Sequence, residues 1–116
     1  MFAMILGLIA LGLVVVSAIA LTTRWIVNKI KEKKCLGYVK KVILSDIQEL
    51  ANSCDNTISL NQLEQLANSG ITHVMADIDD TGNIVGNVEA IRDTNSQLDD
   101  EVDKLLGRKG MVIVEV

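Results

Sequence analysis

The chain has 116 residues, 49% of them hydrophobic, with a formal net charge of −4, two cysteines and one histidine. This length supports one small domain with a modest core, and two cysteines are too few for a disulfide framework. Residues 1–41 carry seven basic side chains and one acidic one, whereas residues 42–116 carry four basic and fourteen acidic ones. Because nucleic acid binds basic surfaces, the acidic C-terminal part predicts no nucleic-acid partner.

An uninterrupted apolar run occupies residues 1–21. As a helix rising 1.5 Å per residue, this run would cover about 30 Å, the thickness of the hydrocarbon core of a bilayer. We therefore predict a transmembrane helix over residues 1–23. A cleaved signal peptide is the rival interpretation, because residues 18–20 have the small-x-small form of a cleavage site. The missing basic n-region and the length of the run argue against cleavage.

Basic residues follow the apolar run in a juxtamembrane segment, residues 24–37. Such residues stay on the cytoplasmic side of a membrane helix. We therefore expect a single-pass protein of the cell membrane, with the N-terminus outside and the C-terminal domain in the cytoplasm. The lipid bilayer is thus a predicted partner, and Cys35 lies where palmitoylation is an alternative to a free thiol. The residues predicted to anchor this segment at the membrane are Arg24, Trp25, Lys29, Lys31, Lys33 and Lys34.

Small residues recur near one face of the predicted membrane helix, where two helix backbones can approach closely. This pattern predicts either a helix-packing seam in an oligomer or the ordinary small-residue content of membrane helices. The residues in this pattern are Ala3, Gly7, Ala10 and Ser17.

Residues 38–116 form the predicted cytoplasmic domain. Apolar residues at steps of three and four predict an amphipathic helix over residues 38–53. Ser59 begins a capping-box pattern, S-L-N-Q, which predicts a second helix that ends at Gly70. Alternating apolar residues then predict two strands, residues 71–78 and 83–91, joined in a hairpin.

Residues 94–96 offer N-caps for a third predicted helix, which ends at Gly107. The valine-rich segment of residues 111–116 predicts a final strand. The predicted fold class is therefore α+β: one N-terminal transmembrane helix followed by a small α-α-β-β-α-β domain with a mixed three-stranded sheet. The last strand is predicted to leave an open sheet edge that could accept a strand from a partner.

The segment of residues 77–82, DIDDTG, resembles three different functional motifs. Its D-x-D-x-T pattern resembles the first motif of the haloacid dehalogenase superfamily. That resemblance implies a phosphotransfer site in which Asp77 is the nucleophile and Asp79 the general acid/base. It covers six residues, and the 34 residues that follow leave no room for the remaining motifs of the family.

Asp77, Asp79 and Thr81 also match positions 1, 3 and 5 of an EF-hand loop, which makes them weak candidates for a divalent metal ion. Position 12 is Val88 instead of a bidentate carboxylate, and the flanking segments are predicted strands. The tripeptide of residues 80–82 is similar to that of dimeric aspartic proteases, but the helical periodicity downstream is incompatible with their all-β fold.

A hairpin turn explains the same segment without further residues, since Asp and Asn bond their own backbone and Gly82 adopts a left-handed conformation. The sequence therefore predicts no catalytic residue and no cofactor. The predicted function is a non-catalytic anchor, adaptor or assembly subunit of a membrane complex, with a protein partner or a second copy. The alternative is a membrane-tethered metal sensor or phosphotransfer-type enzyme that uses Asp77, Asp79 and Asp80.

Overall fold

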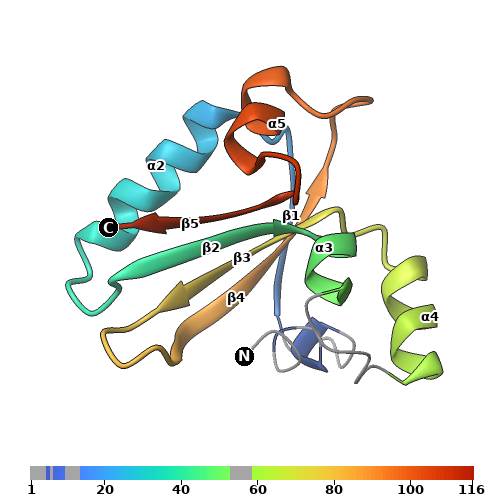
Figure 1. Cartoon of the computed structure of the whole chain (residues 1–116), viewed down its shortest axis with the longest axis horizontal. Coiled ribbons are helices and arrows are strands. Elements are labelled where there is room, and N and C mark those ends of the chain that lie inside the picture. The colour runs from blue at the N-terminus through green and yellow to red at the C-terminus, as the bar shows by residue number, and fades with distance from the viewer. Residues whose placement is uncertain (1–4, 6, 10–13, 53–58) are drawn as a thin grey trace.

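Five strands form one mixed sheet in this computed structural model, which describes all residues except 1–4, 6, 10–13 and 53–58. The strand order is β1-β4-β3-β2-β5, and the helices cover both faces of the sheet (Figure 1). Helices α2 and α5 pack on one face, whereas α3 and α4 pack on the other. The α+β class is thus confirmed, but the predicted three-stranded sheet is wrong.

The strands are β1 (Val15–Ile19), β2 (Lys41–Asp46), β3 (His73–Ile78), β4 (Ile84–Asp93) and β5 (Met111–Glu115). The helices are α2 (Thr23–Lys34), α3 (Ile47–Asn52), α4 (Leu60–Asn68) and α5 (Asp100–Leu106). Strand β1 is parallel to β4, and the other neighbouring strands pair antiparallel. The two ends of the sheet are therefore β1 and β5.

The predicted transmembrane helix over residues 1–23 is wrong. Ile5 and residues 7–9 are helical, but Val15 begins strand β1, which pairs with β4 over its whole length. Among the described residues, no helix is both long and apolar enough to cross a bilayer. The predicted single-pass localisation, with its orientation across the cell membrane, is therefore contradicted. The apolar run instead supplies a strand and core residues such as Ile5 and Leu21, which are fully buried.

The helix predicted over residues 38–53 is also wrong, because this segment forms strand β2 and then the short helix α3. Val42, Ile43 and Leu44 are consecutive buried residues, as expected for a strand covered on both faces. Their apolar spacing fits a helix equally well, and the neighbouring strands β3 and β5 stabilise the extended form. Cys54, the cysteine that follows this segment and whose spacing continues its apolar pattern, lies outside the described residues.

The later elements agree with the sequence patterns. Helix α4 begins with the predicted capping box between Ser59 and Gln62, and β3 and β4 form the predicted hairpin. Helix α5 begins at Asp100 because the Asp99 side chain accepts hydrogen bonds from two backbone amides, so its cap lies later than predicted. Of the apolar residues of α4, Leu66 is buried, whereas Leu60 and Leu63 are exposed.

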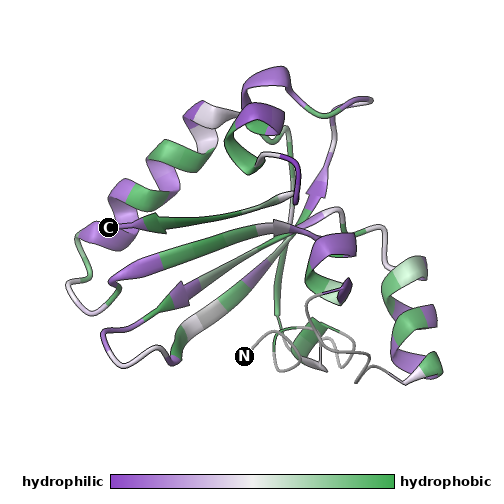
Figure 2. Cartoon of the chain, viewed as in Figure 1, coloured by the Kyte–Doolittle hydropathy of each residue, from purple (hydrophilic) through white to green (hydrophobic). Residues whose placement is uncertain are grey.

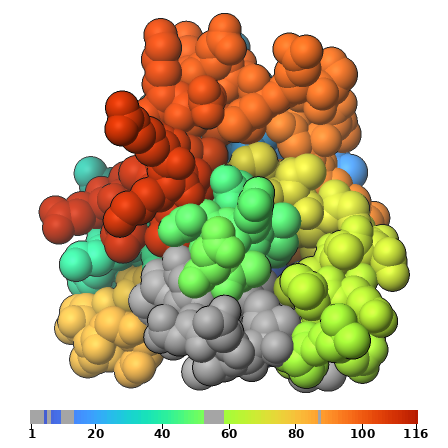
Figure 3. Space-filling view, turned by 45° about the vertical axis from the view of Figure 1, so that its right-hand side comes forward, coloured from blue at the N-terminus to red at the C-terminus, as the bar shows by residue number. Residues whose placement is uncertain are grey.

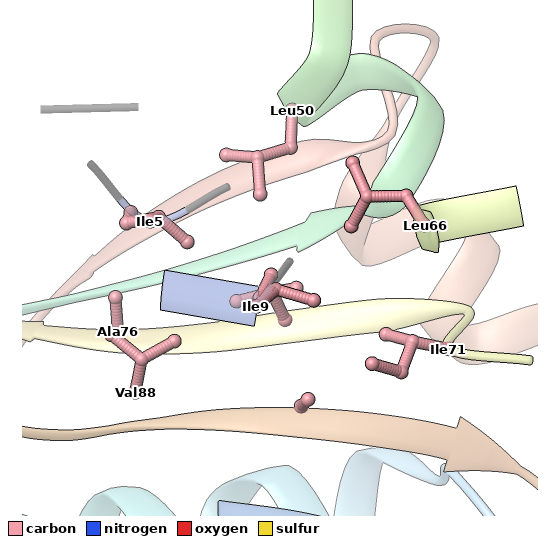
Figure 4. Packing of buried hydrophobic residues seen from close by; sticks show 9 residues of the cluster. Ile5, Ile9, Leu50, Leu66, Ile71, Ala76 and Val88 are labelled. Atoms are coloured by element: carbon pink, nitrogen blue, oxygen red, sulfur yellow. The ribbon is translucent and has the colours of Figure 1, made fainter. Parts of the chain in front are cut away.

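Two hydrophobic cores lie on opposite faces of the sheet. Alternation along β3 supplies both of them, since Val74 and Ala76 face α3 and α4 while Met75 faces α2 and α5. Figure 4 shows the first core, in which the buried N-terminal residues Ile5 and Ile9 lie against the sheet. Figure 2 shows the contrast between the hydrophobic strand β5 and the largely hydrophilic helix α5. The sheet therefore has a covered centre and a hydrophobic end strand.

Candidate functional site

Asp77 lies on the sheet face that helix α2 covers. Its Oδ1 accepts a hydrogen bond from Lys33 Nζ at 2.5 Å, and the two side chains are 8% and 12% exposed. This carboxylate is therefore bound in an ion pair at the interface between helix and sheet. An ionised group in such a place needs its partner, because burial of a single charge is costly.

Asp79 lies in the turn of the β3–β4 hairpin and holds that turn together. Its Oδ1 accepts hydrogen bonds from Thr81 N at 3.0 Å, Thr81 Oγ1 at 2.8 Å and Asn83 N at 2.9 Å. The Thr81 hydroxyl, followed by the Asn83 amide, lowers the pKa of the Asp79 carboxyl. Gly82 has a φ of +83°, as the turn interpretation predicts. The segment thus has the geometry of a side-chain-bonded hairpin turn.

The weak metal candidates do not gather into a ligand set. Across the described ranges, no three His, Cys, Asp or Glu side chains lie close enough together to hold a metal ion. Asp77 faces helix α2 and is paired with Lys33, Asp79 bonds within the turn, and Asp80 is exposed. Each carboxylate therefore has a different environment, and the metal and phosphotransfer interpretations gain no support from the geometry.

Helix α2 contains the residues predicted to anchor a membrane. Thr22 caps the helix, and its Oγ1 accepts a hydrogen bond from Trp25 N at 3.2 Å. Lys29 Nζ lies 3.5 Å from Glu89 Oε1 on β4 and 5.6 Å from the centre of the Trp25 ring. With Lys33 one turn further on, two of the predicted anchors instead face acidic residues of the sheet. The sequence analysis did not predict that Lys29 and Lys33 contact the sheet. The one signal for it is their spacing of four, which places both lysines on the same face of a helix.

The remaining predicted sites have separate positions. Arg24, Lys31 and Lys34 are exposed on α2, and Cys35 is an exposed free thiol. Ser17 lies on β1, where its hydroxyl donates a hydrogen bond to Glu89 Oε1 at 2.8 Å. Gly7 lies in the short helical segment, whereas Ala3 and Ala10 are outside the described residues. A helix-packing seam of these four residues therefore has no basis in the described part of the chain.

Strand β5 forms one end of the sheet, as predicted, with β2 as its neighbour. At its two ends, Asp46 N donates to Gly110 O at 2.8 Å and Val116 N donates to Lys40 O at 3.0 Å. Alternate residues of an antiparallel strand bond to the same neighbour, so residues 112 and 114 also bond to β2. The residues whose backbone N–H and C=O groups point away from the sheet are Met111, Ile113 and Glu115.

Hollows flank β5 on both faces of the sheet. On the α2 face, a hollow of about 320 Å³ lies between α2 and the C-terminal end of β5. It is lined by Val27, Ile30, Lys31, Lys34, Val114, Glu115 and Val116. On the other face, a hollow of about 430 Å³ has an apolar floor of Ile43, Ile78 and Ile113, with Lys40, Lys41 and residues 79–82 around it. The space-filling view shows β5 and α5, in red and orange, at the molecular surface (Figure 3).

No protein-family model, curated protein or solved structure matches this chain. Strand β5, at one edge of the sheet, exposes the large apolar side chain of Ile113.

Buried His73 is expected to make the stability of the fold depend on pH. Its Nδ1 lies 2.9 Å from Thr72 Oγ1. Burial lowers the pKa of His73 below 6.5, while the charges of Asp46 and Asp93 oppose that shift. The unfolded chain therefore binds more protons, and the free energy of unfolding should fall as the pH decreases below 6.5. Urea unfolding at pH values of about 7.5 and about 5.5 measures this loss. His73→Gln should reduce the loss, and an unchanged pH dependence in that variant would contradict the assignment.

Proposed function

We propose that this protein is a non-catalytic interaction module that binds a partner protein through the open edge of β5. Unpaired N–H and C=O groups along an end strand form a template for another strand. Here the outward groups of Met111, Ile113 and Glu115 supply that template. This is the single observation that carries the proposal.

The composition of β5 supports pairing. Protected edges contain proline, inward-pointing charges or bulges, but β5 has the sequence MVIVE with one charged residue and no proline. Ile113 is 54% exposed, so a large aliphatic side chain of this edge strand faces solvent. A partner strand would cover this side chain and satisfy the outward backbone groups.

Strand β1 forms the opposite end of the sheet and is the alternative edge. Val15 and Val16 are exposed there. Hollows on both faces of the sheet lie beside β5. These features favour β5 as the binding edge.

The environment of the aspartates supports a non-catalytic role. A nucleophile or general base must be free to meet a substrate. Asp77 is instead bound to Lys33 beneath helix α2, and Asp79 accepts three hydrogen bonds from its own turn. Both side chains therefore have structural roles that explain their positions.

Replacing Ile113 with proline tests the proposal. Proline removes one outward N–H group and places its ring in the path of an incoming strand, but it leaves the bonds to β2 intact. Partner binding by the full chain should weaken about tenfold or more, and the circular dichroism spectrum should stay unchanged. Ile113→Val, which keeps the N–H group, is the matched control and should bind like the wild type.

Binding is measured by capture of partners from the native cells, with this chain itself counted as a partner, followed by hydrogen exchange on the purified complex. The amides of Met111, Ile113 and Glu115 should become protected in the complex. Equal binding by Ile113→Pro, or protection confined to α3 and α4, would overturn the proposal.

A further inference from the structure

We propose that the partner is a second copy of this chain, paired antiparallel with the first across a two-fold axis near the middle of β5. This inference rests on the proposed function, since it names the occupant of the same edge. It follows from the backbone groups, the side chains and the charges that lie around β5.

The backbone geometry of β5 is self-complementary. In an antiparallel pair of identical strands, the outward N–H and C=O groups of Met111, Ile113 and Glu115 meet the same groups of the second copy. This two-fold axis is perpendicular to the sheet, so the faces that carry α2 and α5 in the two copies lie on the same side of the joined sheet. Ile113 of each copy then lies next to apolar side chains of the other, which covers its exposed surface.

Charge selects the antiparallel arrangement. Helix α2 has five basic side chains and one acidic one, whereas α5 with its cap, residues 99–106, has four acidic and one basic. Both helices pack on the same face of the sheet. Lys31 and Lys34 of α2 line the hollow at the C-terminal end of β5, while α5 precedes its N-terminal end (Figure 1).

Antiparallel pairing brings the C-terminal end of each β5 against the N-terminal end of the other. It therefore places the basic helix α2 of each copy beside the acidic helix α5 of its partner, and this contact occurs twice. Parallel pairing through the same edge would need a two-fold axis along the strands, which turns the α2 and α5 faces of the two copies to opposite sides of the joined sheet, so the helices of opposite charge would not meet. Both helices also expose an apolar side chain, Val27 on α2 at 43% and Leu105 on α5 at 37%.

A charge exchange tests this geometry with two variants of the full chain. The first carries Lys31→Glu and Lys34→Glu, and the second carries Asp100→Lys and Asp103→Lys. All four side chains are exposed, so both variants should keep the wild-type circular dichroism spectrum. Sedimentation equilibrium should show a wild-type dimer, and each variant alone should dimerise about 100-fold more weakly because like charges then face each other at both contacts.

Mixing the two variants should restore the dimer as a one-to-one heterodimer, which native mass spectrometry identifies by its mass. In that heterodimer, the introduced acidic side chains of α2 meet the introduced basic side chains of α5. Failure of the mixture to pair would overturn the geometry, and so would growth of the wild type into open-ended assemblies, which a β1-to-β5 contact would produce.

The two proposals fail in different ways. If the wild type is monomeric at concentrations of about 200 μM while another captured protein protects the outward β5 amides, the second-copy inference is wrong and the edge function stands. If the wild type dimerises and Ile113→Pro dimerises equally well, the edge itself is not the contact and both proposals are wrong.

Discussion

Replacing Asp77 with alanine is expected to lower the free energy of unfolding by about 3–5 kcal/mol. The variant leaves the Lys33 ammonium at the interface between α2 and the sheet without its carboxylate partner. Most of the loss comes from this uncompensated charge rather than from the attraction in the intact pair. Urea unfolding monitored by circular dichroism measures the change.

A double replacement separates a structural role of Asp77 from a catalytic one. Lys33→Met with Asp77→Leu removes both charges and fills similar space, so the stability should recover to within about 1–2 kcal/mol of the wild type. An Asp77→Ala variant as stable as the wild type would show that the pair is solvated. In that case, the carboxylate would again be available for other chemistry.

Replacing Gly110 with alanine is expected to cost about 2–4 kcal/mol. Gly110 has a φ of +75°, and an added Cβ would collide with the carboxylate of Asp46. That carboxylate accepts a hydrogen bond from Glu49 N at 2.6 Å, in the first turn of α3. The substitution therefore strains the backbone at the start of β5 and displaces the side chain that caps α3, the helix that directly follows β2.

Gly37→Ala is the matched control for this second prediction. Gly37 has a φ of +77°, but an added Cβ would meet no atom within 4 Å. The control should therefore cost only the backbone strain, about 1–2 kcal/mol. Equal losses in the two variants would show that the Asp46 contact contributes nothing. Faster amide exchange in α3 of Gly110→Ala alone would show that the cap is displaced.

Local patterns were sufficient for the second half of the chain. The capping box at Ser59 and the hairpin turn at Asp79 and Gly82 follow from signals within a few residues, and the structure confirms them. These elements are stabilised by hydrogen bonds between near neighbours, which is why short patterns identify them.

Long-range packing decided the first half of the chain. An apolar run has the same composition whether it lies in lipid or in a protein core, and the pairing of Val15 with Glu89 lies outside any local window. Likewise, Lys33 is exposed or buried according to whether Asp77 of a distant strand lies beneath it. The fold of these segments depends on partners far away in the chain, because burial and strand pairing are properties of the assembled sheet.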